Sequence, residues 1–204
     1  EIPQKACTDR EDEIIPCIKC FHCLDYRRAP TFACAVNPTV GREDRLPLLV
    51  PPVGKKKRVV IIGGGPAGMQ AALTARRRGH EVSLLERASV LGGKLTFSRQ
   101  VPFKHDLRKS MDYLIHMVEK RGIQVRLNTE ATPEAVEKEG FDVVVAATGA
   151  APRLPRIPGI ETADAVNIID VYEKEAELGQ SVVVIGGSST GAEAAVFLAK
   201  RGHT

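Results

Sequence analysis

One stretch predicts how this 204-residue chain folds: Val59-Val60-Ile61-Ile62-Gly63-Gly64-Gly65-Pro66-Ala67-Gly68. Four apolar residues in a row are typical of a strand that is buried on both faces of a parallel sheet. Gly63, Gly65 and Gly68 follow it with G-x-G-x-x-G spacing. In this pattern the first glycine permits a tight turn, the second lets a pyrophosphate approach the backbone, and the third lets the helix pack on the strand. The stretch therefore predicts a dinucleotide site at a helix N-terminus.

The pattern on both sides of this stretch alternates between strand and helix. Short apolar runs predict further strands, and amphipathic periods closed by glycine predict helices. The expected strands are 59–62, 81–86, 123–127, 142–147 and 181–185, and the expected helices are 66–78, 104–121 and 191–201. Alternating strands and helices imply an α/β fold with a parallel, right-handed, Rossmann-like sheet.

The strand–turn–helix unit occurs twice. Val182-Val183-Val184-Ile185 is followed by a second glycine-rich turn, and both predicted helices end in Arg-Gly-His. Two such units predict two dinucleotides. The second unit has Ser188 at the central glycine position, where a side chain either crowds a pyrophosphate or donates a hydrogen bond to it. The candidate residues of this second site are Gly186, Gly187, Ser188, Ser189, Thr190 and Gly191.

The residues after the second strand indicate what the first site binds. Glu86 follows Gly63 by 23 residues, where an acidic side chain can accept hydrogen bonds from ribose hydroxyls. The alternative interpretation of Glu86 is a solvated strand end. A second glycine pair, Gly92-Gly93, favours FAD because it lets the backbone approach a longer nucleotide. The small residues of 146–149, Ala147 among them, leave room for a cofactor at the end of another strand.

Four cysteines form a C-x2-C-x2-C-x10-C array before the dinucleotide stretch. Cys17, Cys20, Cys23 and Cys34 have the spacing expected for the ligands of a [4Fe–4S] cluster. The competing interpretations are a structural zinc site, whose cysteines usually occur as two separate pairs, and unligated cysteines. The surrounding segment is rich in proline and poor in apolar periodicity, so we expect it to need a metal to fold.

Composition excludes several classes of protein. A net charge of +4, 4% aromatic residues and no tryptophan argue against nucleic-acid binding. No apolar run is long enough to span a membrane and no signal peptide is visible. Clustered rather than paired cysteines favour a reducing, cytoplasmic setting. The histidines form no hydrolytic constellation, so the sequence predicts no catalytic residue.

The cysteine segment resembles a known family. The string from Cys17 to Cys23 and the string Cys34-Ala35-Val36-Asn37-Pro38-Thr39-Val40-Gly41-Arg42-Glu43 are similar to those of old-yellow-enzyme-like multidomain iron–sulfur flavoproteins. That family includes 2,4-dienoyl-CoA reductase, 2-enoate reductase and trimethylamine dehydrogenase. The resemblance covers essentially the whole chain. It implies an N-terminal FMN-binding TIM barrel, a [4Fe–4S] loop, and an FAD domain interrupted by an NAD(P)H domain.

The resemblance also implies a division of this chain, which would be the C-terminal part of a longer polypeptide. Residues 1–16 would link to the FMN barrel, 17–50 would bind the cluster, 51–152 would begin the FAD domain, and 153–204 would begin the NAD(P)H domain. The chain begins with Glu1 and ends just after a helix that should lead into a strand, so we expect the fold to be incomplete at its C-terminus. A homo-oligomer is also compatible with the family.

By resemblance, electrons would pass from NAD(P)H to FAD, across the cluster to FMN, and on to an activated C=C bond such as that of an enoate or dienoyl-CoA. One alternative is a non-catalytic module that binds ADP, as in trimethylamine-dehydrogenase-like relatives. A glutamate-synthase small-subunit type is a further alternative, but it lacks the string from Val36 to Glu43. The residues that would line FAD are Gly63, Gly65, Pro66, Ala67, Gly68, Glu86, Arg87, Gly93, Lys94, Ala131, Thr148 and Gly149.

Overall fold

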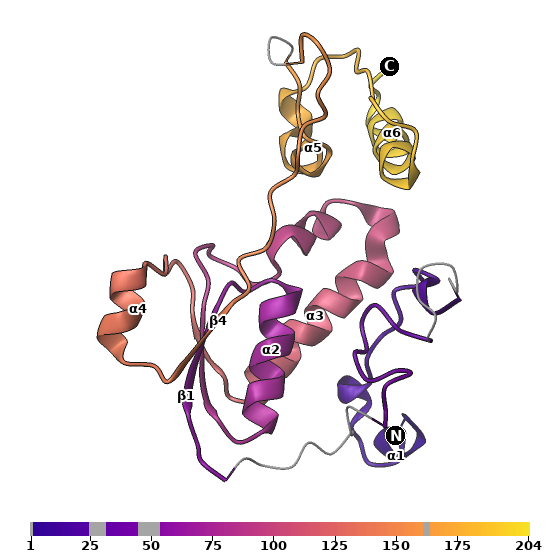
Figure 1. The fold of residues 1–204 in the computed structure, drawn as a ribbon. Coiled ribbons are helices and arrows are strands. Elements are labelled where there is room, and N and C mark those ends of the chain that lie inside the picture. Colours follow the sequence, from indigo (N-terminus) through magenta and orange to yellow (C-terminus); the bar gives the residue numbers. More distant parts are fainter. Residues whose placement is uncertain (1, 25–31, 45–53, 161–163) are drawn as a thin grey trace. The chain divides into compact units, whose positions relative to one another are not determined.

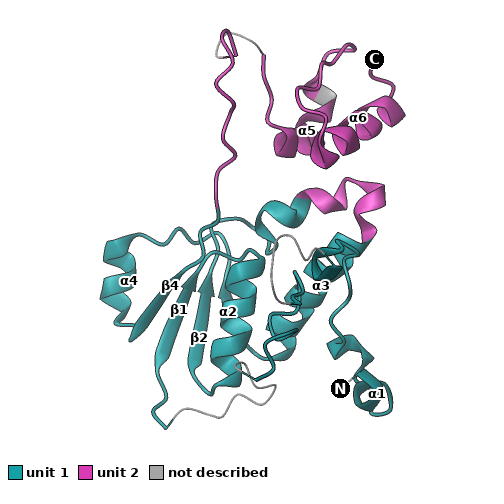
Figure 2. Ribbon diagram, turned by 45° about the vertical axis from the view of Figure 1, so that its right-hand side comes forward, with its two compact units in different colours: residues 1–96, 106–149 teal, residues 97–105, 150–204 magenta. Residues whose placement is uncertain are grey.

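The structure is a computed structural model that describes residues 2–24, 32–44, 54–160 and 164–204. The chain divides into two compact units, which Figure 2 shows in different colours. The first unit contains residues 1–96 and 106–149, and the second contains residues 97–105 and 150–204. The assignment of particular segments to FAD and NAD(P)H stays a prediction.

The first unit is built on a four-stranded parallel sheet (Figure 1). Its strands lie in the order β3-β2-β1-β4, and each pairs in parallel with its neighbours. Their bounds are β1 Arg58–Ile62, β2 Glu81–Leu85, β3 Gln124–Arg126 and β4 Val143–Ala146. Four of the five expected strands are therefore formed, and the expected α/β fold with a parallel sheet is confirmed.

Two helices cover one face of this sheet. They are α2 (Pro66–Arg77) and α3 (His105–Lys120). Because successive strand residues point to opposite faces, Val59 and Ile61 face these helices while Val60 faces away. The core on this face also contains Met69, Ala72, Leu73, Val82, Leu84, Leu91, Met117, Val118 and Ile123. Both helices begin and end within two residues of the bounds expected from the sequence.

The opposite face carries a helix that the sequence analysis missed, α4 (Pro133–Glu139). Thr132 caps its start, because the Thr132 hydroxyl oxygen accepts a 3.2 Å hydrogen bond from the Ala135 amide. Gly140 ends it in the left-handed conformation, with φ of 64°. Val136 of α4 packs with the β1 and β2 residues that point to this face. The capping residues are visible in the sequence, but a helix of 7 residues is too short to show a clear helical period.

The second unit has its own small core between α5 (Ile168–Lys174) and α6 (Ser189–Arg201). Tyr172 stands at its centre. The Tyr172 ring stacks on Phe97 with centroids 5.2 Å apart and meets the edge of Phe197 at 5.0 Å. Burial raises the pKa of the Tyr172 hydroxyl, and the nearby Glu193 charge adds to this effect.

The strand expected at 181–185 is not formed, so this prediction was wrong. Val182 and Val184 pack on the core of the second unit, whereas Val183 is 85% exposed and Ile185 is 68% exposed. The segment thus has the alternation of a strand with one covered face. A strand also needs a hydrogen-bonded neighbour, and in the described part of the chain no other strand pairs with this segment.

Short helices occur elsewhere, including in the N-terminal residues. The first is α1 (Ile2–Ala6). The 3₁₀ helices are η1 Glu11–Glu13, η2 His22–Leu24, η3 Gly93–Arg99, η4 Pro102–Lys104 and η5 Glu175–Glu177. Among the described residues, no helix combines the length and the apolar character that crossing a bilayer requires.

Candidate functional site

The first glycine turn lies at the carboxyl end of β1 and is built by close backbone contacts. Gly63 has φ of 108°, a conformation that side chains rarely permit. A β carbon on Gly63 would lie 2.3 Å from the Ala147 carbonyl oxygen. A β carbon on Gly68 would lie 1.8 Å from the Gly63 carbonyl oxygen. Glycine is therefore required at both positions for helix, turn and sheet to meet.

A second glycine pair approaches this turn. The Gly92 amide donates a 2.9 Å hydrogen bond to the Gly64 carbonyl oxygen. A β carbon on Gly93 would lie 3.0 Å from the Gly65 α carbon. Helix α2 then begins at Pro66 without a side-chain cap on its amides. Two backbone loops and an uncapped helix N-terminus thus meet at one place, an arrangement suited to a pyrophosphate.

Glu86 is buried at the end of β2 and is bonded to the turn. Its Oε2 accepts a 2.6 Å hydrogen bond from the Gly64 amide, and its Oε1 accepts a 2.8 Å hydrogen bond from the Ala88 amide. An ionised carboxylate has about four acceptor positions, so further acceptor capacity remains. The structure therefore gives Glu86 a defined orientation beside the turn, while its contact with a ribose stays a prediction.

The other predicted residues of the first site follow the same edge of the sheet. Ala147, Thr148 and Gly149 come after β4, just as Gly63 comes after β1. In parallel sheets this carboxyl edge is where ligands bind. Arg87 and Lys94 are exposed, whereas Ala131 packs in the core beneath α4. The structure thus brings the glycines, Glu86 and 147–149 to one edge.

The second glycine turn repeats the geometry of the first. Gly186 has φ of 113°, and a β carbon on Gly191 would lie 1.8 Å from the Gly186 carbonyl oxygen. Ser188 is the residue that precedes α6, but its hydroxyl makes no capping hydrogen bond. A β carbon on Gly187 would meet nothing within 4 Å. The turn is therefore formed even where its flanking strand is not.

An ion pair that the sequence did not reveal lies on the helix after this second turn. Lys104 Nζ lies 2.6 Å from each carboxylate oxygen of Glu193, in the second turn of α6. Both residues belong to the second unit. They are 89 residues apart in sequence, so no local pattern could have paired them.

The cysteine loop, residues 17–23, has a local hydrogen bond to sulfur and two residues with positive φ. The Lys19 amide donates a 3.3 Å hydrogen bond to Cys17 Sγ. Lys19 and Phe21, the residues on either side of Cys20, have positive φ of 53° and 55°. Amide hydrogen bonds to sulfur are among the interactions that tune iron–sulfur clusters.

Within the described ranges, the four thiols are not gathered into one group. All five cysteines are free thiols, and in the described residues no three potential ligands lie close enough to hold a metal ion. The four thiols still have the donor chemistry that a cluster requires, so their role as ligands stays a prediction. Parts of the proposed cluster segment, 25–31 and 45–50, lie outside the described residues.

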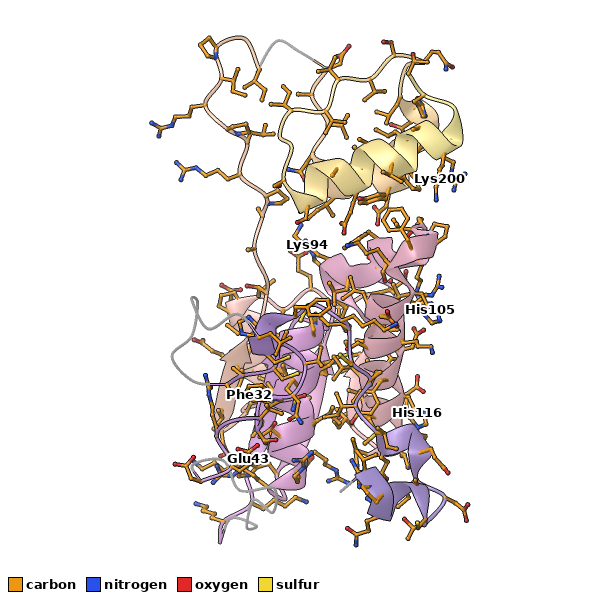
Figure 3. The ribbon with its side chains drawn as sticks, turned by 90° about the vertical axis from the view of Figure 1, so that its right-hand side faces the viewer. Phe32, Glu43, Lys94, His105, His116 and Lys200 are labelled. Atoms are coloured by element: carbon orange, nitrogen blue, oxygen red, sulfur yellow. The ribbon has the colours of Figure 1, made fainter. Side chains whose placement is uncertain are left out.

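The string after Cys34 forms a defined turn. Asn37 Oδ1 accepts hydrogen bonds from the amide and the hydroxyl of Thr39, at 3.2 and 2.8 Å. Glu43, labelled in Figure 3, accepts a 3.1 Å hydrogen bond from the Gly41 amide. A β carbon on Gly41 would lie 1.8 Å from the Phe32 carbonyl oxygen. The residues that carry the family resemblance therefore build this turn.

An ionic cluster joins η1 to the C-terminal half of α3, and the sequence analysis missed it. Hydrogen bonds from Lys120 and then His116 lower the pKa of Asp12 to about 2. Glu13 is buried, which alone would raise its pKa. A hydrogen bond from Arg10, supported by Lys120, nevertheless lowers the pKa of Glu13 to about 2.

Most of the chain matches a known protein family. Residues 57–204 match the family model described as pyridine nucleotide-disulphide oxidoreductase. The chain belongs to the pyridine nucleotide-disulphide oxidoreductase family. The matched residues include both glycine turns. The first turn follows β1, and the second follows the extended segment 182–185. Members of this family use FAD and NAD(P)H, in agreement with the cofactors expected from the sequence.

Individual relatives match nearly the whole chain. Cinnamate reductase from Clostridium sporogenes is 35% identical over 99% of this chain and 30% of its own length. NADH oxidase from Thermoanaerobacter brockii is 38% identical over 99% of this chain and 32% of its own length. A 2-naphthoyl-CoA reductase bound to 2-naphthoyl-CoA has a TM-score of 0.88 at 35% identity, over 99% of this chain and 31% of that one.

These relatives are oxidoreductases, and the resemblance to multidomain flavoproteins of the alkene-reductase type is confirmed. The chain spans about a third of the length of the relatives that it matches. The family of this chain therefore does not by itself define the activity of a whole protein.

Proposed function

We propose that this chain is the electron-transfer portion of an NAD(P)H-dependent flavin oxidoreductase. The observation that carries the proposal is the pair of glycine turns. In each of them, a β carbon on the last glycine would lie 1.8 Å from the carbonyl oxygen of the first. Two turns of this construction in one chain suit two dinucleotides, FAD at the first and NAD(P)H at the second.

The bound groups would supply the redox chemistry: a hydride from NAD(P)H to FAD, then single electrons through a [4Fe–4S] cluster to FMN in an N-terminal barrel of the same polypeptide. The residues of this chain would bind and orient those groups. Gly63 to Gly68, with Gly93, would hold the FAD pyrophosphate through backbone amides. Glu86 would accept hydrogen bonds from the ribose. Gly186 to Gly191 would receive the nicotinamide dinucleotide.

Cys17, Cys20, Cys23 and Cys34 would ligate the cluster as thiolates. The Lys19 amide already points at Cys17 Sγ and would stabilise the negative charge on that sulfur. The turn that Asn37 and Glu43 build would fix the approach of Cys34. Chemistry of this kind needs no catalytic side chain here, in agreement with the absence of a predicted catalytic residue.

The proposed substrate is a compound with an activated C=C bond, such as an enoate or dienoyl-CoA. The relatives named for cinnamate and 2-naphthoyl-CoA support this class, since both compounds are conjugated carboxylic derivatives. Saturating such a bond takes two electrons and two protons, and one hydride equivalent with one solvent proton supplies them.

The test is an anaerobic spectrum of the full-length protein, with iron, sulfide and extracted flavins quantified. We expect about four irons, FAD and FMN, and bleaching of the flavin band by NADH or NADPH. ADP in place of FAD would make the first site a non-catalytic module. Zinc without iron would overturn the electron-transfer role.

A further inference from the structure

The C-terminal end of helix α3 contacts the N-terminal segment of the chain. Lys120 Nζ lies 2.5 Å from Asp12 Oδ2 and 3.3 Å from Glu13 Oε1. His116, labelled on α3 in Figure 3, lies 2.7 Å from the same Asp12 oxygen. Arg121 lies 3.2 Å from Glu13 Oε2. The pairing is more than a single surface contact, because the Glu13 side chain is 7% exposed.

The N-terminal end of α3 contacts the cysteine loop. Lys19 Nζ lies 2.9 Å from Asp106 Oδ2, and Asp106 stands in the first turn of the helix. Lys19 is itself held in a positive-φ conformation between Cys17 and Cys20. The side chain that makes this contact therefore leaves the loop at the point where its backbone turns.

The two contacts lie near opposite ends of α3. Asp106 and Lys120 are separated by about 21 Å along a helix that rises 1.5 Å per residue. Glu13 and Lys19 are six residues apart, which gives about 20 Å for a fully extended chain. Residues 15–20 belong to no helix or strand, and the chain departs from full extension at Lys19, where φ is 53°. The segment runs in the direction opposite to α3.

The same helix touches the first dinucleotide site. A β carbon on Gly92 would lie 2.6 Å from Met111 Sδ, and Met111 is fully buried. Met111 lies between Asp106 and Lys120 in α3. The helix therefore contacts the cysteine loop on one side and the loop of Gly92 and Gly93 on another, all within the first unit.

We infer that α3 is a two-ended clamp that holds the cysteine loop against the helix whose Met111 contacts the loop of Gly92 and Gly93. In this clamp, Asp106 receives Lys19, and Lys120 with Arg121 receives Asp12 and Glu13. These are positioning residues, since they act on the cysteine loop and its flanking segment through ion pairs. The inference rests on the proposed function only in one respect: that the cysteine loop binds the cluster and the loop of Gly92 and Gly93 binds FAD.

The first experiment measures the clamp without a cluster. Hydrogen exchange of residues 14–24 is followed by mass spectrometry in metal-free, full-length protein. The variants are Asp106→Asn, Lys19→Met and Glu13→Gln, with Glu119→Gln as the matched control because Glu119 is an exposed acid of the same helix. We expect exchange of 14–24 to accelerate on the order of tenfold in the three variants. Glu119→Gln should exchange like the unchanged protein.

To separate misfolding from loss of the clamp, exchange of 58–85 and the bound FAD are measured in the same samples. Unchanged values show that the sheet and first site are intact. Reversing the pair, with Lys19→Glu and Asp106→Lys together, should restore slow exchange of 14–24 if the ion pair is responsible.

The second experiment uses protein after anaerobic iron and sulfide reconstitution. We expect Asp106→Asn and Glu13→Gln to broaden the electron paramagnetic resonance signal of the reduced cluster and slow its reduction by NADH severalfold, whereas direct reduction of FAD is unchanged. Exchange equal to that of Glu119→Gln in all three variants would overturn the clamp. If no protein takes up iron, the proposed function fails, while the metal-free exchange still decides the inference.

Discussion

The Gly64 amide donates a 2.6 Å hydrogen bond to Glu86 Oε2, so the residue expected to hold a ribose also holds the glycine turn. The two residues are 22 positions apart and belong to the ends of adjacent parallel strands. A single carboxylate therefore links the local conformation of the turn to the nucleotide that the turn would bind.

Removing this carboxylate should have two effects. Glu86→Ala leaves the buried amide of Gly64 without its acceptor, which should lower the free energy of unfolding by about 1–3 kcal/mol. It should also lower the FAD content of purified protein. Thermal unfolding with and without added FAD separates the effects. Glu86→Gln, which keeps one acceptor oxygen, should be less destabilising. Equal stability of Glu86→Ala and the unchanged protein would contradict this prediction.

Two glycines of the second turn, Gly187 and Gly191, allow a matched comparison. Gly191→Ala places a β carbon 1.8 Å from the Gly186 carbonyl oxygen, whereas Gly187→Ala meets nothing within 4 Å. We expect Gly191→Ala to displace the turn, at a cost of about 3 kcal/mol or more. NADH and NADPH affinity, measured by calorimetry, should be lost in Gly191→Ala and largely kept in Gly187→Ala. The reverse order would show that the turn is not the binding element.

Acid should loosen the contact between η1 and α3. The pKa values of Asp12 and Glu13 are lowered to about 2 from 3.8 and 4.5, chiefly by hydrogen bonds from Lys120 and Arg10. Lowered values mean that these groups stabilise the fold fully above about pH 4.5, and that the contribution is lost as the pH falls toward 2. Urea unfolding between pH 6 and 3 should show this loss. Asp12→Asn combined with Glu13→Gln should flatten the dependence.

The ion pair on α6 should affect nucleotide binding through charge. Lys104→Met leaves the Glu193 carboxylate without this ion pair. Glu193 lies in the second turn of α6, close to the helix N-terminus where an anionic pyrophosphate would bind. We expect the KM for NADH or NADPH to rise roughly three- to tenfold by repulsion. Lys104→Arg should retain normal affinity. An unchanged KM in Lys104→Met at low ionic strength would contradict this role.

Local signals allowed most of the first unit to be predicted. The apolar run 59–62 and the glycines after it specify their strand, turn and helix within about 20 residues, because period and positive φ are properties of neighbouring residues. The helix α4 had equally local caps, Thr132 and Gly140, and could have been found from them. The strand expected at 181–185 was wrong because a strand depends on a partner that no local pattern supplies.

The sequence by itself determined the fold class, the two glycine turns and the cysteine spacing, because each depends on residues close together in the chain. Only the tertiary structure decided that Asp12 and Glu13 meet Lys120, that Lys19 meets Asp106, and that Lys104 meets Glu193. Charged side chains are common and pair with any opposite charge that packing brings near. Which pairs form is therefore set by how the elements of each unit pack and not by their order in the sequence.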